Sequence, residues 1–127
     1  MACREQRTDP LSDSALLAER IAAIGSEKLA EDIVLLDMRG VVDYTDWFVV
    51  MSGRNTRQVQ AIAEEVAFRL KQEQGLLPAR IEGMKESAWV LIDFVDVVVH
   101  VFDPEARETY RLDELWGQVP QRAIAGD

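Results

Sequence analysis

The chain has 127 residues, 48% of them hydrophobic, which is the composition of an ordinary globular protein with one domain. Acidic side chains outnumber basic ones, 23 to 14, so the net charge of −9 disfavours direct contact with nucleic acid and favours a basic partner. No apolar run is long enough to cross a membrane, the first residues lack the apolar core of a secretory signal, and Cys3 alone excludes a disulfide framework. We therefore expect a cytoplasmic protein.

An amphipathic helix is predicted near the start of the chain. It begins either at Asp9–Pro10 or at the alternative capping residues Ser12 and Asp13. Apolar side chains then recur at helical spacing. Gly25 ends this helix, or the helix runs on to Leu29.

Two strands and a second helix follow. The continuous apolar run Ile33–Met38 predicts a buried strand, and Trp47–Met51 predicts a second strand after a loop rich in Gly and Asp. Asn55, with Gln58 three residues later, resembles a capping box. The apolar stripe after it predicts the clearest helix of the chain, which Gly75 ends.

The segment Trp89–Phe102 follows a short predicted strand between residues 76 and 82 and is the most informative part of the sequence. Its two β-rich runs are separated by a short break, which predicts a hairpin. If the two residues between Asp93 and Asp96 form the loop, one face carries Val90, Ile92, Phe94, Val97 and Val99. On the other face Trp89 then lies beside His100, Leu91 beside Val98, and Asp93 beside Asp96. The first face must be core, and the second is predicted to bind a partner through Trp89, for which burial in the core stays open as the alternative.

Catalytic chemistry is not predicted. The turn Ser52–Gly53, between a strand and a capped helix, is a setting that can hold phosphate, but no Asp-x-Asp pair for Mg²⁺ follows it. His100 is the only histidine and has no nucleophile pattern to serve, and with Asp93 and Asp96 alone it makes an improbable metal site. A nucleotide-binding or nucleotidyltransferase-like enzyme that uses Ser52–Gly53 stays open as the alternative.

Residues 15–117 resemble the ribosomal silencing factor (Iojap) family. The resemblance rests on the order and spacing of Asp37, Thr45–Asp46, Trp47–Val50, Ser52–Gly53, Arg57–Val59, Ala61–Ala63, the run Trp89–Phe102, Asp103–Glu105, Arg107, Tyr110 and Leu112–Trp116. It implies an α/β fold with a mixed β-sheet of about five strands flanked by helices, which is nucleotidyltransferase-like but lacks the active site. It also favours the longer version of the first helix.

The same resemblance implies the function. Family members bind the large ribosomal subunit through its protein fourteen, sterically block association with the small subunit, repress translation without performing chemistry, and pair as homodimers when free. No cofactor or metal is expected. We predict the partner-binding residues Glu82, Lys85, Trp89, Leu91, Asp93, Asp96, Val98, His100 and Tyr110.

Two further expectations concern the hairpin turn and the chain ends. The family turn is Tyr-Gly-Asp, whereas this chain has Phe94–Val95–Asp96, and Val disfavours the positive φ of a two-residue turn. Either the loop is longer, with four residues keeping the register, or its backbone is strained. We predict a flexible start (1–10), one domain (11–117) that includes a short terminal helix at Leu112–Trp116, and a flexible tail (118–127).

Overall fold

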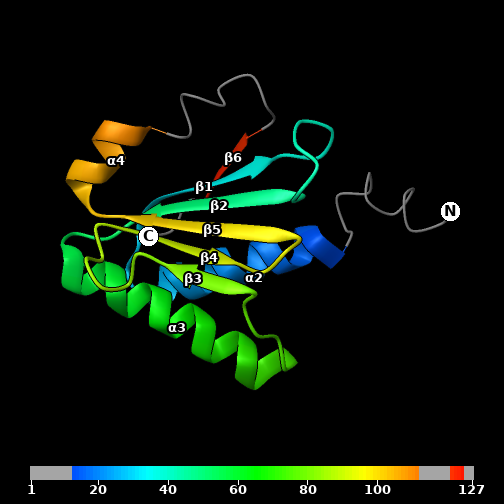
Figure 1. Ribbon diagram of the computed structural model, residues 1–127, viewed down its shortest axis with the longest axis horizontal. Helices are drawn as coiled ribbons and strands as arrows, with labels where there is room; N and C mark the ends of the chain where they lie inside the picture. The colour runs from blue at the N-terminus through cyan, green and yellow to red at the C-terminus, as the bar shows by residue number, and fades with distance from the viewer. Residues whose placement is uncertain (1–12, 112–120, 125–127) are drawn as a thin grey trace, which may run out of the picture.

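The computed structural model describes residues 13–111 and 121–124 (Figure 1). The elements are α2 (Asp13–Glu27), β1 (Glu31–Asp37), β2 (Trp47–Ser52), α3 (Thr56–Gln74), β3 (Arg80–Glu82), β4 (Trp89–Asp93), β5 (Val97–Phe102), α4 (Pro104–Tyr110) and β6 (Gln121–Ile124). The strands form one sheet in the order β3-β4-β5-β2-β1-β6. β2 and β5 are parallel and the other neighbours are antiparallel, so the predicted α/β fold with a mixed sheet is confirmed.

Helix α3 begins and ends where its sequence predicts. Asn55 is the N-cap, and its side-chain oxygen accepts a hydrogen bond from the backbone N–H of Gln58 at 2.9 Å. The Gln58 side chain turns back to accept from the N–H of Arg54 at 2.6 Å. Gly75 ends the helix in the left-handed conformation, at φ 64°, with its N–H directed to the last carbonyls. Local sequence therefore fixes both ends of the helix.

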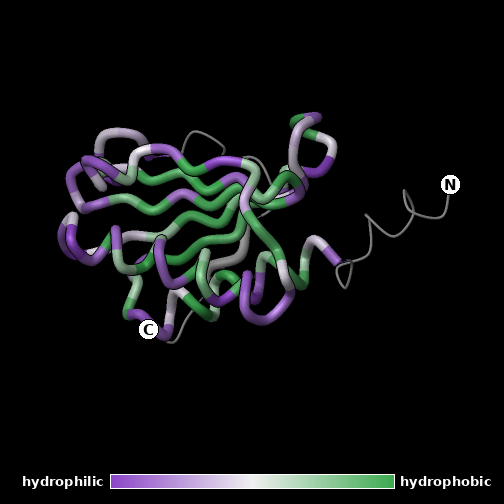
Figure 2. Tube along the Cα trace, turned by 60° about the horizontal axis from the view of Figure 1, so that its bottom comes forward, coloured by the Kyte–Doolittle hydropathy of each residue, from purple (hydrophilic) through white to green (hydrophobic). Residues whose placement is uncertain are grey.

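Helices α2 and α3 cover one face of the sheet, which we call the helix-covered face (Figure 1). The strands are the most apolar stretch of the trace (Figure 2), because they bury apolar side chains on both faces of the sheet. The fully buried side chains here include Ile21, Ile24, Leu35, Met51, Ile62, Leu70 and Ile92. All five residues predicted for the core face of the hairpin lie in this cluster, which confirms that part of the prediction.

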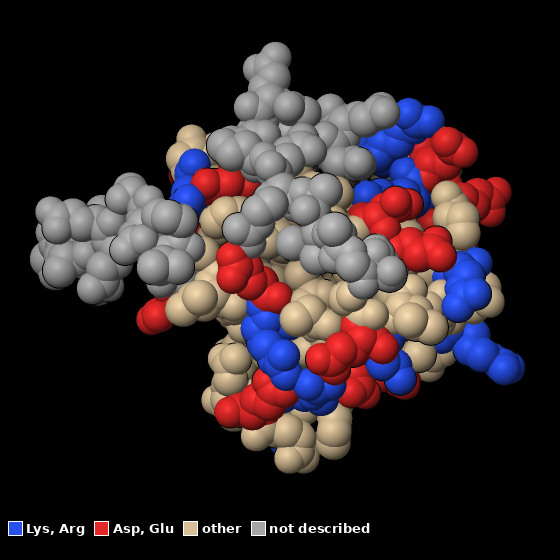
Figure 3. Space-filling model, turned by 180° about the vertical axis from the view of Figure 1, so that it is seen from behind, with Lys and Arg blue, Asp and Glu red and all other residues tan. Residues whose placement is uncertain are grey.

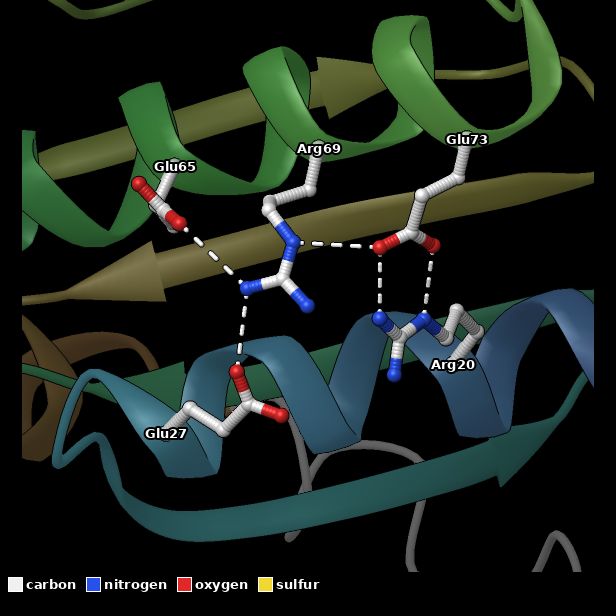
Figure 4. A network of polar contacts seen from close by, with 5 residues as sticks. All are labelled: Arg20, Glu27, Glu65, Arg69 and Glu73. Atoms are coloured by element: carbon white, nitrogen blue, oxygen red, sulfur yellow. Dashed lines mark hydrogen bonds and ion pairs between the residues drawn. The ribbon is translucent and has the colours of Figure 1, made fainter.

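An ionic network ties α2 to α3 on the outside of this core (Figure 4). Arg20 donates to both carboxylate oxygens of Glu73, at 2.8 and 2.6 Å. Arg69 donates to Glu27 at 3.0 Å, to Glu73 at 3.1 Å and to Glu65 at 3.4 Å. Hydrogen bonds from Arg20 lower the pKa of Glu73 to about 2. Seen from behind, acidic and basic side chains lie next to one another, so this face presents no extended patch of one sign (Figure 3).

The hairpin forms, but its predicted register is wrong by two residues. Trp89 lies opposite Phe102, Leu91 opposite His100 and Asp93 opposite Val98. Asp93 and Asp96 are therefore not paired across the strands. A shift of two residues keeps every side chain on its predicted face, so the division into core and outer side chains survives the error.

The turn at Val95 is the strained alternative that the sequence allows. Phe94 and Val97 close it, with the Phe94 N–H donating to the Val97 carbonyl at 2.9 Å. Val95 has φ +76°, and the N–H of Asp96 donates to the carbonyl of Phe94 at 2.9 Å, which is a γ-turn centred on a β-branched residue. The Asp93 carboxylate accepts from the Val95 N–H at 2.8 Å and so stabilises the turn.

Several predictions at the chain ends are corrected or lie outside the described residues. The predicted flexible tail includes residues 121–124, which instead form β6 and pair with β1, so an otherwise open edge of a buried strand is covered. After Asp103, which caps it, the chain forms the helix α4. The flexible start, the cap at Asp9–Pro10 and the terminal helix at Leu112–Trp116 all lie outside the described ranges.

Candidate partner-binding surface

The face of the sheet opposite α2 and α3, which we call the outer face, is also apolar. Its buried side chains are Leu36, Met38, Phe48, Val50, Val98, Phe102 and Ala106. Trp89 and Leu91 pack against them and remain partly exposed. Within the described residues, Ala106 of α4 is the only helical member of this cluster. An apolar sheet face with so little helical cover is suited to contact another molecule.

Trp89 and His100 are joined by a hydrogen bond on the outer face. The indole Nε1–H donates to His100 Nδ1 at 3.1 Å, although the two residues are diagonal rather than opposite. The acceptor role of Nδ1 selects the neutral tautomer with its proton on Nε2. Nε2 is buried and has no hydrogen-bond partner among the described residues. Burial lowers the pKa of His100 to about 4, so the ring is neutral near pH 7.

Six aromatic rings form a continuous row across the outer face, in the order Tyr44, Phe48, His100, Trp89, Phe102 and Tyr110; we call it the aromatic row. Both ends of the row are accessible, with Tyr44 62% and Tyr110 48% exposed. The contact between Trp89 and Tyr110 is the shortest, with ring centroids 4.5 Å apart. Aromatic side chains that are half exposed at one end are typical anchors of interfaces.

Charged side chains border the outer face at its β3 edge. Arg80 lies opposite Asp93 and Glu82 opposite Leu91, so both point to the same side of the sheet as Trp89. Arg80 pairs with Glu82 at 2.8 Å and lies 3.5 Å from Asp93. The carboxylates outnumber the guanidinium here, and the border is acidic.

The structure gathers most of the predicted partner-binding residues at this surface. Trp89, Leu91, Asp93, Val98 and His100 share the outer face, Tyr110 reaches it from α4, and Glu82 borders it. Asp96 lies in the hairpin turn, where its carbonyl accepts from Asp46 and Trp47, and Lys85 lies in the exposed loop between β3 and β4. Val98 and His100 are each 5% exposed, so they support the surface from below.

Sequence reasoning missed three members of the aromatic row, namely Tyr44, Phe48 and Phe102. Phe102 lies two residues after His100 on the same strand and so faces the same side of the hairpin as Trp89, and this signal was available in the sequence. Phe48 joins the row because β2 runs parallel to β5, where Phe48 pairs with Val98. Nothing in the local sequence predicts the long-range pairing of β2 with β5.

Gly83 fixes the approach to Trp89. Its φ is +88°, and a Cβ at this position would clash with the carbonyl oxygen of Trp89. The loop therefore passes directly over the start of β4, which only glycine allows. This close contact between Gly83 and the Trp89 backbone fixes the position of Trp89 at the start of β4.

The turn Ser52–Gly53 lines a cavity of about 300 Å³ together with residues of α4, among them Arg107. The N–H groups that would hold a phosphate are already bonded: Gly53 donates to the Phe102 carbonyl at 2.8 Å and Arg54 to the Gln58 side chain. The Ser52 hydroxyl accepts from Arg107 at 2.8 Å. A Cβ on Gly53 would lie 2.8 Å from the backbone nitrogen of Val59, so packing against α3 explains this glycine. The geometry therefore does not favour the nucleotide-binding alternative.

No described helix is long and apolar enough to cross a membrane. In the described part of the chain, no group of three or more His, Cys, Asp or Glu side chains is arranged to hold a metal ion.

Comparison with known proteins assigns the family. Residues 11–126 match the family model described as "Ribosomal silencing factor during starvation". The chain is 41% identical over 116 residues to the ribosomal silencing factor of Halalkalibacterium halodurans, covering 91% of this chain and 97% of that one. It is 44% identical over 99 residues to the Bacillus subtilis counterpart, covering 78% and 83%. A crystal structure from Bacillus halodurans superimposes with a TM-score of 0.70 at 40% identity, covering 84% of this chain and 96% of that one. The chain belongs to the ribosomal silencing factor family.

Proposed function

We propose that this protein binds the large ribosomal subunit through the aromatic row and sterically keeps the small subunit from joining it, so that translation is repressed without any chemical step. Family membership supports the ribosomal partner. The observation that carries the choice of surface is the row itself, in which Trp89 is partly exposed, hydrogen-bonded to His100 and in tilted contact with Tyr110. Such a role places the protein in the cytoplasm.

The geometry supports a protein partner rather than RNA. The net charge of −9 and the acidic border at Glu82 and Asp93 repel phosphates and attract basic proteins. Basic proteins are abundant on the ribosome, and the family resemblance singles out protein fourteen of the large subunit.

Subunit joining is the direct test. Purified subunits are mixed at low millimolar Mg²⁺ with and without the protein and separated on sucrose gradients. We expect fewer joined ribosomes and co-migration of the protein with the large subunit alone. The Trp89→Ala variant is the matched comparison, and at the same concentration it should prevent joining much less than the wild type does. Unchanged profiles at saturating wild-type protein would refute the proposal.

The electrostatic part has its own test. Exposed charges act mainly on the association rate, so binding to large subunits should slow as salt rises. The double variant Glu82→Gln/Asp93→Asn should associate more slowly than the wild type at low salt, and its association rate should depend less on salt. An association rate that does not change with salt would mean that the contact is purely apolar.

Two finer points belong to the proposal. The contact on the large subunit is its protein fourteen, which a pull-down with the isolated ribosomal protein tests without the rest of the ribosome. The free protein pairs with a second copy, which sedimentation velocity over a range of concentrations tests. A sedimentation coefficient that stays at the monomer value would remove the homodimer from the proposal without touching the ribosomal role.

A further inference from the structure

Helix α4 is held in place by a few individual contacts. Of its residues, Ala106 is the buried one. A helix this short is marginal by itself in water, so its position depends on tethers to the sheet. Asp103 provides one tether at the start, where its carboxylate accepts from the Ala106 N–H at 2.8 Å and its N–H donates to the Ala88 carbonyl at 2.9 Å. These contacts fix where α4 begins and leave its far end to other side chains.

Arg107 provides the tether in the middle of the helix. Its Nη1 donates to the Ser52 hydroxyl at 2.8 Å, and its Nη2 donates to the Asp32 carbonyl at 2.9 Å. Ser52 is 4% exposed and ends β2, so this part of the contact is anchored in the sheet. Because the guanidinium is planar and donates through both Nη1 and Nη2, it fixes a direction as well as a distance.

A β-bulge supplies the second acceptor. Between Glu31 and Val34, β1 has one more residue than the facing part of β2, and Asp32 has φ +51°. Asp32 pairs in neither of the two ladders of β1. Its carbonyl is therefore outside the sheet hydrogen bonding and is turned to Arg107. Bulges commonly redirect one backbone or side-chain group in this way.

Tyr110 lies three residues after Arg107, on nearly the same side of α4. Its ring packs against Trp89 in a tilted arrangement, with centroids 4.5 Å apart, and stacks on Phe102, at 6.3 Å. We propose that Arg107 is a positioning residue: by clamping α4 to the bulge of β1, it holds Tyr110 on Trp89 and makes α4 part of the partner-binding surface. This inference rests on the proposed function, which assigns the aromatic row to the ribosomal contact.

Binding measurements test the coupling between the two residues. Arg107→Ala and Tyr110→Ala should each weaken binding to purified large subunits about tenfold. The double variant should lose no more than the worse single variant, because both changes disturb one contact. Arg57→Ala removes an equal charge from the exposed part of α3 and should bind like the wild type. Losing a positive charge should by itself help binding to a basic partner, so weaker binding by Arg107→Ala would oppose the charge effect.

A readout in the free protein separates this inference from the proposed function. In NMR spectra, nuclear Overhauser contacts between the Tyr110 and Trp89 rings should be present in the wild type, lost in Arg107→Ala and partly kept in Arg107→Lys, with the remaining core signals unchanged. If these contacts survive in Arg107→Ala, or if the two single losses add in the double variant, the positioning role is wrong. If wild-type protein does not bind large subunits, the proposed function fails, while the ring contacts still decide what Arg107 does.

Discussion

The two faces of the sheet bury apolar side chains in different ways. The helix-covered face is closed by α2 and α3, and the helices are tied together by the network of Arg20, Arg69 and three glutamates (Figure 4). The outer face has the short helix α4 as its described helical cover and ends in the exposed rings of Tyr44 and Tyr110. The apolar side chains of the helix-covered face are buried within the fold, whereas the outer face presents aromatic side chains for contact with another molecule.

This difference assigns separate tasks to the two faces. A change in the helix-covered face should alter the free energy of unfolding and leave binding by the folded molecules unchanged. A change in the aromatic row should mainly alter binding. The polar groups of the two faces also differ. The ionic network over the helix-covered face is exposed to solvent, whereas His100 on the outer face is buried and neutral.

The largest effect is expected in the helix-covered core. Ile62 is 0% exposed, and Ile62→Ala should destabilise the protein by about 2–5 kcal/mol through lost burial and a residual cavity. Urea unfolding measures the loss. Sedimentation with large subunits at a temperature where the variant is folded should give wild-type affinity. Weakened binding by a well-folded Ile62→Ala sample would break the separation of the two faces.

The second prediction concerns pH and the outer face. The pKa of His100 is about 4 in the folded state and ordinary, near 6.5, when unfolded, so the unfolded chain binds a proton first as pH falls. Stability should be full above pH 6.5 and decline by about 3 kcal/mol down to pH 4. The rings around His100, from Phe48, Trp89 and Phe102, carry no charge to offset this.

A variant identifies His100 as the source of this slope. His100→Asn keeps an acceptor for Trp89 and removes the titration, so its stability should be flat from pH 6.5 to 4.5. The carboxylates with lowered pKa, Glu73 and Asp37, titrate below that window and do not interfere. Chemical denaturation at several pH values measures both proteins, and equal slopes would show that His100 is not the group responsible.

The third prediction concerns Trp89. Trp89→Ala should weaken binding to the large subunit by about 2 kcal/mol, roughly thirtyfold, because an anchoring ring is removed from the centre of the row. Its melting temperature should fall less than that of Ile62→Ala, since the ring is only partly buried. Trp89→Phe keeps most of the apolar surface and loses the bond to His100, and it should bind with intermediate affinity. Melting and binding are measured on one sample, and a large drop in melting temperature with intact binding would place Trp89 in the core instead.

The smallest effect is expected from the ionic network. Glu73→Gln removes the shared partner of Arg20 and Arg69, but the groups are exposed and solvent screens them. The melting temperature should fall slightly at low salt and match the wild type at about 1 M salt, where the Debye length is about 3 Å. The lowered pKa of Glu73 predicts that its contribution is present above pH 4.5 and lost as pH falls through about 2. If the melting temperature of Glu73→Gln stayed below that of the wild type at high salt, Glu73 would stabilise the protein by interactions other than charge attraction.

The sequence predicted the elements with local signals and missed those without them. Asn55 and Gly75 gave both ends of α3, and apolar alternation divided the hairpin into its two faces. The register failed because pairings two residues apart put the same side chains on each face, so only the turn could separate them. Val95 at φ +76° is a turn that residue preferences disfavour.

The candidate surface was predicted in part for the same reason. Trp89, His100 and Tyr110 came from the hairpin and the family resemblance, whereas Phe48 entered the row through the parallel pairing of β2 with β5. The bulge at Asp32 that meets Arg107 could not be predicted, because nothing near Asp32 in the sequence marks an extra residue in a strand. Contacts between segments that are distant in the chain are therefore the part of this surface that local sequence patterns did not predict.

The position of β6 has a consequence for synthesis of the protein. β6 covers the edge of β1 but lies more than eighty residues after it in the chain. At about 5–20 residues per second, the ribosome makes β1 several seconds or more before its neighbour on that side. During this interval an apolar strand from Ile33 to Leu36 has one edge open, and open edges recruit other strands. A nascent chain that stalls before residue 121 would therefore be prone to aggregate on the ribosome that made it.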